Sequence, residues 1–172
     1  MLPTAPPVRI YEADVIAMTE TLYNTQILRL AAALPRTQRL ADPDITVQRT
    51  SRICGSRVTV DLKVEDGRIV DYGQTVKACA LGQASCSLVA SRIIGQTRAS
   101  FAPVAAAFRA MIAGDGPPPD GAWADLAIFL PVRDHRSRHG SILLPFDAVM
   151  AAFDGLDSTA PDAAVGSNDT VR

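Results

Sequence analysis

The sequence predicts an α+β domain in which a small three-stranded antiparallel sheet has helices packed on one face. Two observations carry this prediction. Apolar and polar residues alternate from Val58 to Glu65, which is typical of a half-buried strand, and the dipeptide Asp66-Gly67 that follows favours a tight hairpin turn. Segments with helical spacing of apolar residues flank this hairpin, so we expect one helix, three strands and then several helices.

The first half of the chain follows from local spacing. Apolar residues at intervals of three to five predict a helix over residues 13–34, which Pro35 ends. Residues 46–53 have the pattern of a short strand. Residues 58–65 and 69–76 then form the two strands of the hairpin, which is the most strongly supported structural prediction.

The second half of the chain is predicted to be mainly helical. Helices are expected over residues 80–94, 101–112, 123–130 and 141–153, with a proline-rich loop at 114–121. The last helix requires Pro145 to lie in its first turn, where the missing N–H costs nothing.

The chain is predicted to hold a single domain. Its 172 residues suit one hydrophobic core. Residues 1–12 are proline-rich and expected to be flexible, residues 13–155 form the domain, and residues 156–172 are rich in small and polar residues, which indicates a disordered tail.

Composition excludes several classes of partner. The net charge of −1 gives no basis for binding nucleic acid or an anionic membrane, and no apolar run approaches the roughly 20 residues that span a bilayer. The N-terminus lacks the pattern of a signal peptide, so we expect a cytoplasmic protein. In that compartment three cysteines indicate metal binding or reactive thiols rather than structural disulfides.

Cys54 and Cys79 are the main candidates for chemistry. Each lies twelve residues from the predicted turn, so a hairpin without bulges would place them opposite each other; we predict only that both lie at one end of the sheet. Cys79 also precedes the helix at 80–94, whose N-terminus favours a thiolate. The alternative is that each is a buried, inert cysteine, since free cysteine is often a packing residue.

The remaining candidates are weaker. Cys86 lies two helical turns beyond Cys79 among small residues, which indicates packing. His139 and His135 lie in an arginine-rich stretch that is most simply a solvated loop. As a metal ligand, His139 is the better placed of the two, because it stands just before the last predicted helix.

Several segments resemble the NifU N-terminal/IscU/SufU family of iron–sulfur cluster assembly scaffolds. Residues 54–56 resemble its Cys-Gly-Asp loop, residues 77–85 the second cysteine opening an Ala/Ser-rich helix, and residues 138–144 its third-ligand segment. Residues 22–24 resemble its early Tyr-Asn element. Residues 100–120 resemble the insertion of the SufU branch, and the resemblance extends over roughly residues 14–153.

The chain departs from the family pattern at two positions. Ser56 stands where the family has an aspartate, and Gly140 stands where it has its third cysteine. The resemblance implies Cys54, Cys79 and His139 as ligands of the metal or cofactor, with Ser56 as a further candidate. Clusters and tetrahedral zinc generally take four ligands, so the fourth would come from Ser56, from Cys86 after a rearrangement, from a water or from a second chain.

The resemblance implies a scaffold or carrier, not an enzyme. It would accept sulfur from a cysteine desulfurase, bind iron or a labile 2Fe-2S cluster, and serve apo iron–sulfur acceptor proteins; zinc is an alternative metal. The rival hypothesis is an interaction protein or persulfide carrier that modulates a desulfurase without holding a cluster. A third is an unrelated thiol enzyme with Cys79 as nucleophile and His139 as base.

Overall fold

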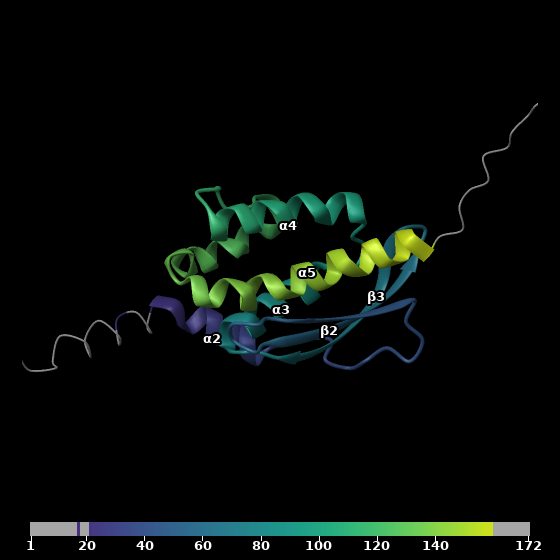
Figure 1. Cartoon of the computed structure of the whole chain (residues 1–172), viewed down its shortest axis with the longest axis horizontal. Helices are drawn as coiled ribbons and strands as arrows, with labels where there is room; N and C mark the ends of the chain where they lie inside the picture. Colours follow the sequence, from purple (N-terminus) through teal and green to yellow (C-terminus); the bar gives the residue numbers. More distant parts are fainter. Residues whose placement is uncertain (1–16, 18–20, 160–172) are drawn as a thin grey trace, which may run out of the picture.

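The computed structural model describes residue 17 and residues 21–159. Its elements are α2 (Thr25–Ala32), β1 (Ile45–Thr50), β2 (Arg57–Glu65), β3 (Arg68–Lys77), α3 (Ala80–Arg92), α4 (Arg98–Ala113), the 3₁₀ helix η1 (Gly121–Asp134) and α5 (Arg136–Thr159). The strands form one antiparallel sheet in the order β1-β2-β3, with helices over one face (Figure 1). The predicted α+β class is confirmed.

The first helix differs from its prediction in the described part of the chain. The helix expected over 13–34 is interrupted at Asn24, whose side chain accepts a hydrogen bond from the Ile27 N–H at 3.0 Å and caps α2. Asparagine is a preferred N-cap because its short side chain satisfies a donor that the first turn leaves free. Residues 13–16 and 18–20 lie outside the described residues.

The hairpin has the predicted two-residue turn, with Asp66 and Gly67 both at positive φ. Val64 pairs with Ile69 as expected, but a bulge between Lys63 and Val64 displaces the partner of every earlier β2 residue by one, so Arg57 pairs with Lys77. The register of a hairpin without bulges is therefore wrong for residues 57–63 and right for Val64 and Glu65. The preceding strand also ends at Thr50 rather than at residue 53.

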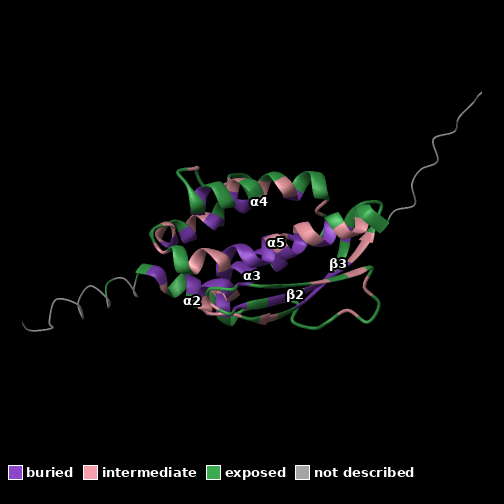
Figure 2. Ribbon diagram, in the orientation of Figure 1, coloured by how far each residue is buried: buried purple, intermediate pink, exposed green. Residues whose placement is uncertain are grey.

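The two faces of the sheet are covered differently. Val58, Val60 and Leu62 are fully buried beneath the helices, as the alternating pattern predicts (Figure 2). Asp61 points to the opposite face and is also fully buried, because the connection from α2 to β1 crosses that face. Its carboxylate accepts hydrogen bonds from the Arg39 guanidinium, the Leu40 N–H and the Thr46 hydroxyl, so this buried charge is satisfied.

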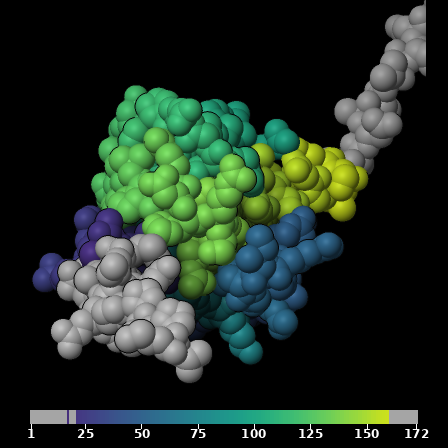
Figure 3. Space-filling model, turned by 60° about the vertical axis from the view of Figure 1, so that its left-hand side comes forward, coloured from purple at the N-terminus to yellow at the C-terminus, as the bar shows by residue number. Residues whose placement is uncertain are grey.

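Aromatic side chains fill the space between the second-half helices. Phe146 of α5 stacks on Phe101 and contacts Phe108 of α4, and Trp123 of η1 packs at the same point. Figure 3 shows α5 lying between α4 and η1 on one side and the strands on the other. No helix among the described residues is long and apolar enough to cross a membrane.

The boundaries of α5 correct two predictions. The helix begins at Arg136 rather than at residue 141, so Pro145 lies inside it and not in its first turn. Because proline has no N–H, the Ser141 carbonyl lacks its helical partner. The helix continues through Thr159, so residues 156–159 are not the disordered tail expected there. The predicted divisions at 1–12 and 160–172 lie outside the described residues and remain predictions.

Candidate functional site

Cys54 lies in the short connection between β1 and β2. The Ser51 N–H donates to the Ser56 carbonyl at 2.8 Å and the Gly55 N–H donates to the Ser51 carbonyl at 2.9 Å, which closes a tight loop. Gly55 has a φ of 70°, a backbone conformation that glycine adopts without strain. The loop leaves Cys54 partly exposed, with its thiol 3.2 Å from Ser56 Oγ.

Cys79 is the residue that caps α3. Its backbone is extended, its carbonyl accepts the N–H of Gln83, and its side chain caps no N–H of the helix. The sulfur instead lies 3.4 Å from Ser141 Oγ.

Ser141 of α5 connects the two cysteines. Its hydroxyl is 3.2 Å from Ser56 Oγ and 3.4 Å from Cys79 Sγ, and Ser56 Oγ in turn accepts from Cys54. The result is a row of thiol, hydroxyl, hydroxyl and thiol, which we call the thiol row (Cys54, Ser56, Ser141 and Cys79). The structure therefore brings both cysteines to one end of the sheet, although they are not ladder partners.

Glycine on α3 makes this arrangement possible. A Cβ at Gly82 would lie 2.4 Å from Ser141 Oγ and 2.8 Å from Ala78 Cβ, so only glycine leaves room for the serine. One turn further along, the buried Ser85 hydroxyl donates to the Ile142 carbonyl at 2.5 Å. Close contact between α3 and α5 thus fixes Ser141 above the first turn of α3.

Hydroxyl groups change the acidity of Cys54. Partial burial alone would raise its pKa, but hydrogen bonds from Ser51, Ser56 and Ser141 outweigh this, so the pKa of Cys54 lies below its ordinary value. Cys86 is the opposite case: it is fully buried in α3, and desolvation raises its pKa well above the usual range. Cys86 is a packing residue, as its sequence context predicts.

The position at which the resemblance implies a third cysteine, residue 140, is closed in this chain. A Cβ at Gly140 would lie 2.7 Å from Ser51 Oγ, so the Ser51 side chain fills the space in front of residue 140. Ser51 is itself buried. Serine hydroxyls of residues 56 and 141 therefore lie between the two thiols, and Ser51 lies against Gly140.

His139 does not join the thiol row. Its Nε2 lies 3.0 Å from the Val132 carbonyl and 2.9 Å from the Arg133 carbonyl, so this nitrogen carries a proton that it donates to the end of η1. Within the described ranges no three His, Cys, Asp or Glu side chains converge on a metal position. A ligand role for His139 stays a prediction that requires the ring to leave these carbonyls.

Two contributors were missed from the sequence. Ser141 was expected only as the first residue of a helix, and Ser51 only as part of a strand. Short hydroxyl side chains carry no spacing signal of the kind that marks thiol and imidazole ligands. The sequence holds one signal for Ser141: it directly follows Gly140 in the segment that resembles the family's third-ligand segment.

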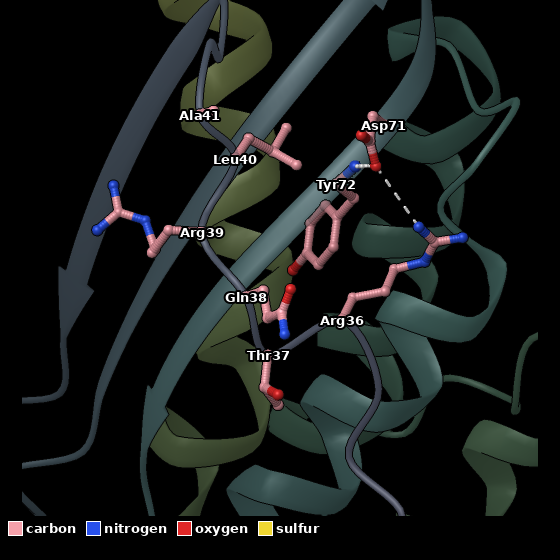
Figure 4. Close-up of a pocket in the computed structure, with 8 residues that line it drawn as sticks. All are labelled: Arg36, Thr37, Gln38, Arg39, Leu40, Ala41, Asp71 and Tyr72. Carbon is pink, nitrogen blue, oxygen red and sulfur yellow. Dashed lines mark hydrogen bonds and ion pairs between the residues drawn. The ribbon is translucent and has the colours of Figure 1, made fainter.

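Away from the thiol row, a hollow of about 470 Å³ lies beside residues 36–41 (Figure 4). Arg36 pairs there with Asp71, while Arg39 turns away toward Asp61. A Cβ at Gly73 would lie 2.4 Å from the Gln38 carbonyl, which shows how closely this segment crosses the sheet. The hollow contains no thiol or imidazole, so the thiol row is the better candidate site.

Comparison with known proteins identifies the family to which this fold belongs. The family model described as NifU-like N terminal domain matches residues 22–139. A curated relative, the iron–sulfur cluster assembly scaffold protein IscU of Thermotoga maritima, is 35% identical over 75 residues, which cover 44% of this chain and 53% of the relative. The matched segment thus spans about half the length of that relative.

Solved structures extend the likeness to most of the fold. The N-terminal NifU-like protein of Brucella abortus has a TM-score of 0.80 and 43% identity, covering 83% of this chain and 99% of its own. A SufU scaffold of Fervidobacterium islandicum has a TM-score of 0.73, covering 78% of this chain and 98% of its own, and at 19% identity it shows the fold alone. The chain belongs to the NifU-like N-terminal domain family of iron–sulfur cluster assembly scaffolds.

Proposed function

We propose that this chain accepts sulfur from a cysteine desulfurase at Cys54 and carries it during iron–sulfur cluster assembly. The thiol row is the observation that supports this most strongly. The Cys54 thiolate attacks the outer sulfur of a persulfide on the donor, that sulfur moves to Cys54, and the donor cysteine leaves as a thiolate. This exchange needs a nucleophilic, accessible thiolate and no further catalytic group.

Family membership supports the pathway, and the chemistry of the site supports the role of a carrier. The family consists of scaffolds rather than catalysts. The IscU relative is named as an assembly scaffold, and we extend that role to this chain together with its partners, a desulfurase and apo iron–sulfur acceptor proteins. We also extend to it the cytoplasmic location that the sequence indicates.

Exposed cations beside the thiols support a protein partner at this end of the sheet. Arg57 and Lys77 are adjacent in the last rung of the sheet, Arg49 and Arg52 precede Cys54, and all four are exposed. Among the described residues none of the four forms an ion pair. Ile53, next to Cys54, is 74% exposed. An acidic surface around the donor's persulfide would complement this rim.

Sulfur transfer tests the proposal. The chain is incubated anaerobically with a desulfurase and cysteine, and persulfide on each cysteine is located by peptide mass spectrometry. We expect sulfur on Cys54, its loss in Cys54→Ser, and unchanged loading in the matched control Cys86→Ser. Arg57→Glu should slow transfer from the desulfurase but not from a small persulfide, whereas Arg68→Glu at the opposite end of the hairpin should slow neither. Equal loading of Cys54→Ser and wild type would refute the proposal.

Iron or a labile 2Fe-2S cluster as cargo is the second candidate. Cys54 and Cys79 remain at family ligand positions, which favours it. The described side chains do not match the ligand set of a bare cluster. The site offers two thiols with hydroxyl groups between them, and His139 donates to backbone carbonyls instead of facing the thiols. The cargo would be held by Cys54 and Cys79, with His139 or Ser56 recruited on binding and a further ligand from another protein; zinc would have the same requirement.

Restoring the third thiol tests this second candidate. Gly140→Cys combined with Ser51→Gly provides a thiol and clears the 2.7 Å contact, whereas Gly140→Cys alone does not clear it. We expect the double variant to bind zinc or reconstituted iron–sulfide more tightly than wild type by about tenfold or more, which corresponds to about 1.4 kcal/mol. A wild-type chromophore that is lost in Cys54→Ser, Cys79→Ser and His139→Ala would instead establish the three-ligand set.

A further inference from the structure

We infer that Cys79 acts as a resolving thiol, which attacks a persulfide on Cys54 and releases the carried sulfur as hydrosulfide, leaving a Cys54–Cys79 disulfide. This inference rests on the proposed acceptance of sulfur by Cys54. It adds a release step that requires no metal. The chain would then deliver sulfur in the reduced form that cluster assembly consumes.

The arrangement of the two thiols carries the inference. Only two hydroxyls separate the sulfurs in the thiol row: Ser56 Oγ accepts from Cys54, and Ser141 Oγ lies 3.2 Å from Ser56 Oγ and 3.4 Å from Cys79 Sγ. No third thiol competes at this point, because Gly140 occupies the position of the family's third cysteine and Cys86 is fully buried.

Neither cysteine is held in place by the strand pairing. Both cysteines lie outside the β2–β3 ladder, whose last pair is Arg57 and Lys77. Cys54 is in a loop next to Gly55, and the Cys79 side chain makes no capping bond that would have to break. A disulfide needs Cα atoms about 4.4–6.8 Å apart, and loop residues adjust to this spacing more easily than paired strand residues.

The step balances without an added oxidant. The electron pair of the Cys79 thiolate forms a bond to the inner sulfur, which is the Sγ of Cys54. The bond between the inner and outer sulfurs breaks, and the outer sulfur leaves as hydrosulfide after gaining two electrons. The two cysteines lose these two electrons and become a disulfide. Two small external thiols then restore the dithiol by exchange and leave as their own disulfide.

The other components of the row have defined tasks in this step. The Ser141 hydroxyl is a positioning group, since it lies 3.4 Å from Cys79 Sγ and 3.2 Å from Ser56 Oγ, which accepts from Cys54. Cys79, the N-cap residue of α3, supplies the attacking sulfur. Loss of Ser141 should therefore slow the release of hydrosulfide from a chain that already carries the persulfide.

Single-turnover release tests the inference on the full chain. The reduced protein is loaded anaerobically with a cysteine persulfide, freed of the donor by rapid desalting, and followed for hydrosulfide and for the Cys54–Cys79 disulfide by non-reducing peptide mass spectrometry. Wild type and the control Cys86→Ser should release hydrosulfide and form the disulfide together, at a rate independent of protein concentration. Cys79→Ser should keep a stable persulfide on Cys54. Ser141→Ala, incubated with the donor until it carries as much persulfide as wild type, should then release hydrosulfide several-fold more slowly.

The outcomes separate this inference from the proposed function. Persulfide that remains on Cys54 in wild type as long as in Cys79→Ser, with no disulfide, would overturn the resolving role and leave sulfur acceptance intact. A release rate that rises with protein concentration would also overturn it, because the attacking thiol would then come from another molecule. If neither wild type nor Cys79→Ser took up sulfur, from the small donor or from a desulfurase, acceptance and release would both be refuted.

Discussion

Two cysteines of this chain, Cys54 and Cys86, show how surroundings decide what a thiol does. Cys54 lies at the open end of the sheet, partly exposed and hydrogen-bonded to serine hydroxyls, and its pKa is lowered. Cys86 lies inside α3 with no exposed surface, and burial raises its pKa. Hydroxyl donors stabilise a thiolate, whereas an apolar core penalises it, so the chain separates a reactive thiol from a packing thiol.

The largest expected difference between the two is in alkylation. Cys86 can react only after the core opens, so iodoacetamide should modify it at least about 1000-fold more slowly than Cys54 in the native protein. Time-resolved mass spectrometry of each peptide gives both rates. Denaturant should abolish the difference, and similar native rates at the two residues would contradict the contrast.

Substitution of each cysteine by serine should change the free energy of unfolding by different amounts. Cys86→Ser places a hydroxyl in the core and should lower the free energy of unfolding by about 1–3 kcal/mol. Cys54→Ser places it among hydroxyls and should change stability by less than about 0.5 kcal/mol. Urea denaturation of both variants measures the difference; a Cys54→Ser loss as large as that of Cys86→Ser would show that Cys54 also packs structurally.

The close contact between α3 and α5 can be disrupted by adding one methyl group at residue 82. A methyl group at residue 82 would lie 2.4 Å from Ser141 Oγ, so Gly82→Ala should displace Ser141 and cost about 1–3 kcal/mol. It should also slow alkylation of Cys54 at neutral pH. Gly114→Ala is a matched control, since its added Cβ contacts only the Ala110 carbonyl at 3.2 Å, far along the chain from the thiols.

The smallest effect is expected from removing one hydroxyl. Ser141→Ala deletes a hydrogen bond that favours the Cys54 thiolate, so the pKa of Cys54 should rise and its pH–rate profile for alkylation should shift to higher pH. A bond worth about 1 kcal/mol corresponds to a roughly fivefold slower reaction at neutral pH. Ser91→Ala, which removes a hydroxyl bond to a helix carbonyl elsewhere on α3, should leave the profile unchanged.

The hairpin and the two thiols could be predicted from the sequence because they depend on local rules. Alternation and the Asp66-Gly67 turn fix the hairpin, and equal distances from the turn place both cysteines at its open end. The bulge between Lys63 and Val64 could not be predicted, because the alternation of apolar and polar residues continues unbroken through both positions. The start of α2 could have been predicted from Asn24, because asparagine is a preferred N-cap residue.

Other features of the site depend on contacts between distant segments. Ser51 and Ser141 meet the thiols only because α5 packs over α3 and the β1–β2 loop, and serine is too common to signal this. The orientation of His139 depends on where η1 ends. The unusual position of Pro145 inside α5 is tolerated by tertiary packing, which local propensity cannot reveal.

Titration of the individual thiols tests the central claim most directly, namely that the hydroxyl-lined end of the sheet makes Cys54 a working thiol. Isotope-labelled cysteine Cβ signals, assigned with the single serine variants, report each protonation state by NMR across the pH range in which the protein stays folded. We predict that Cys54 titrates below the ordinary thiol value and that Cys86 does not titrate. Titration of Cys54 at or above the ordinary value would contradict the claim.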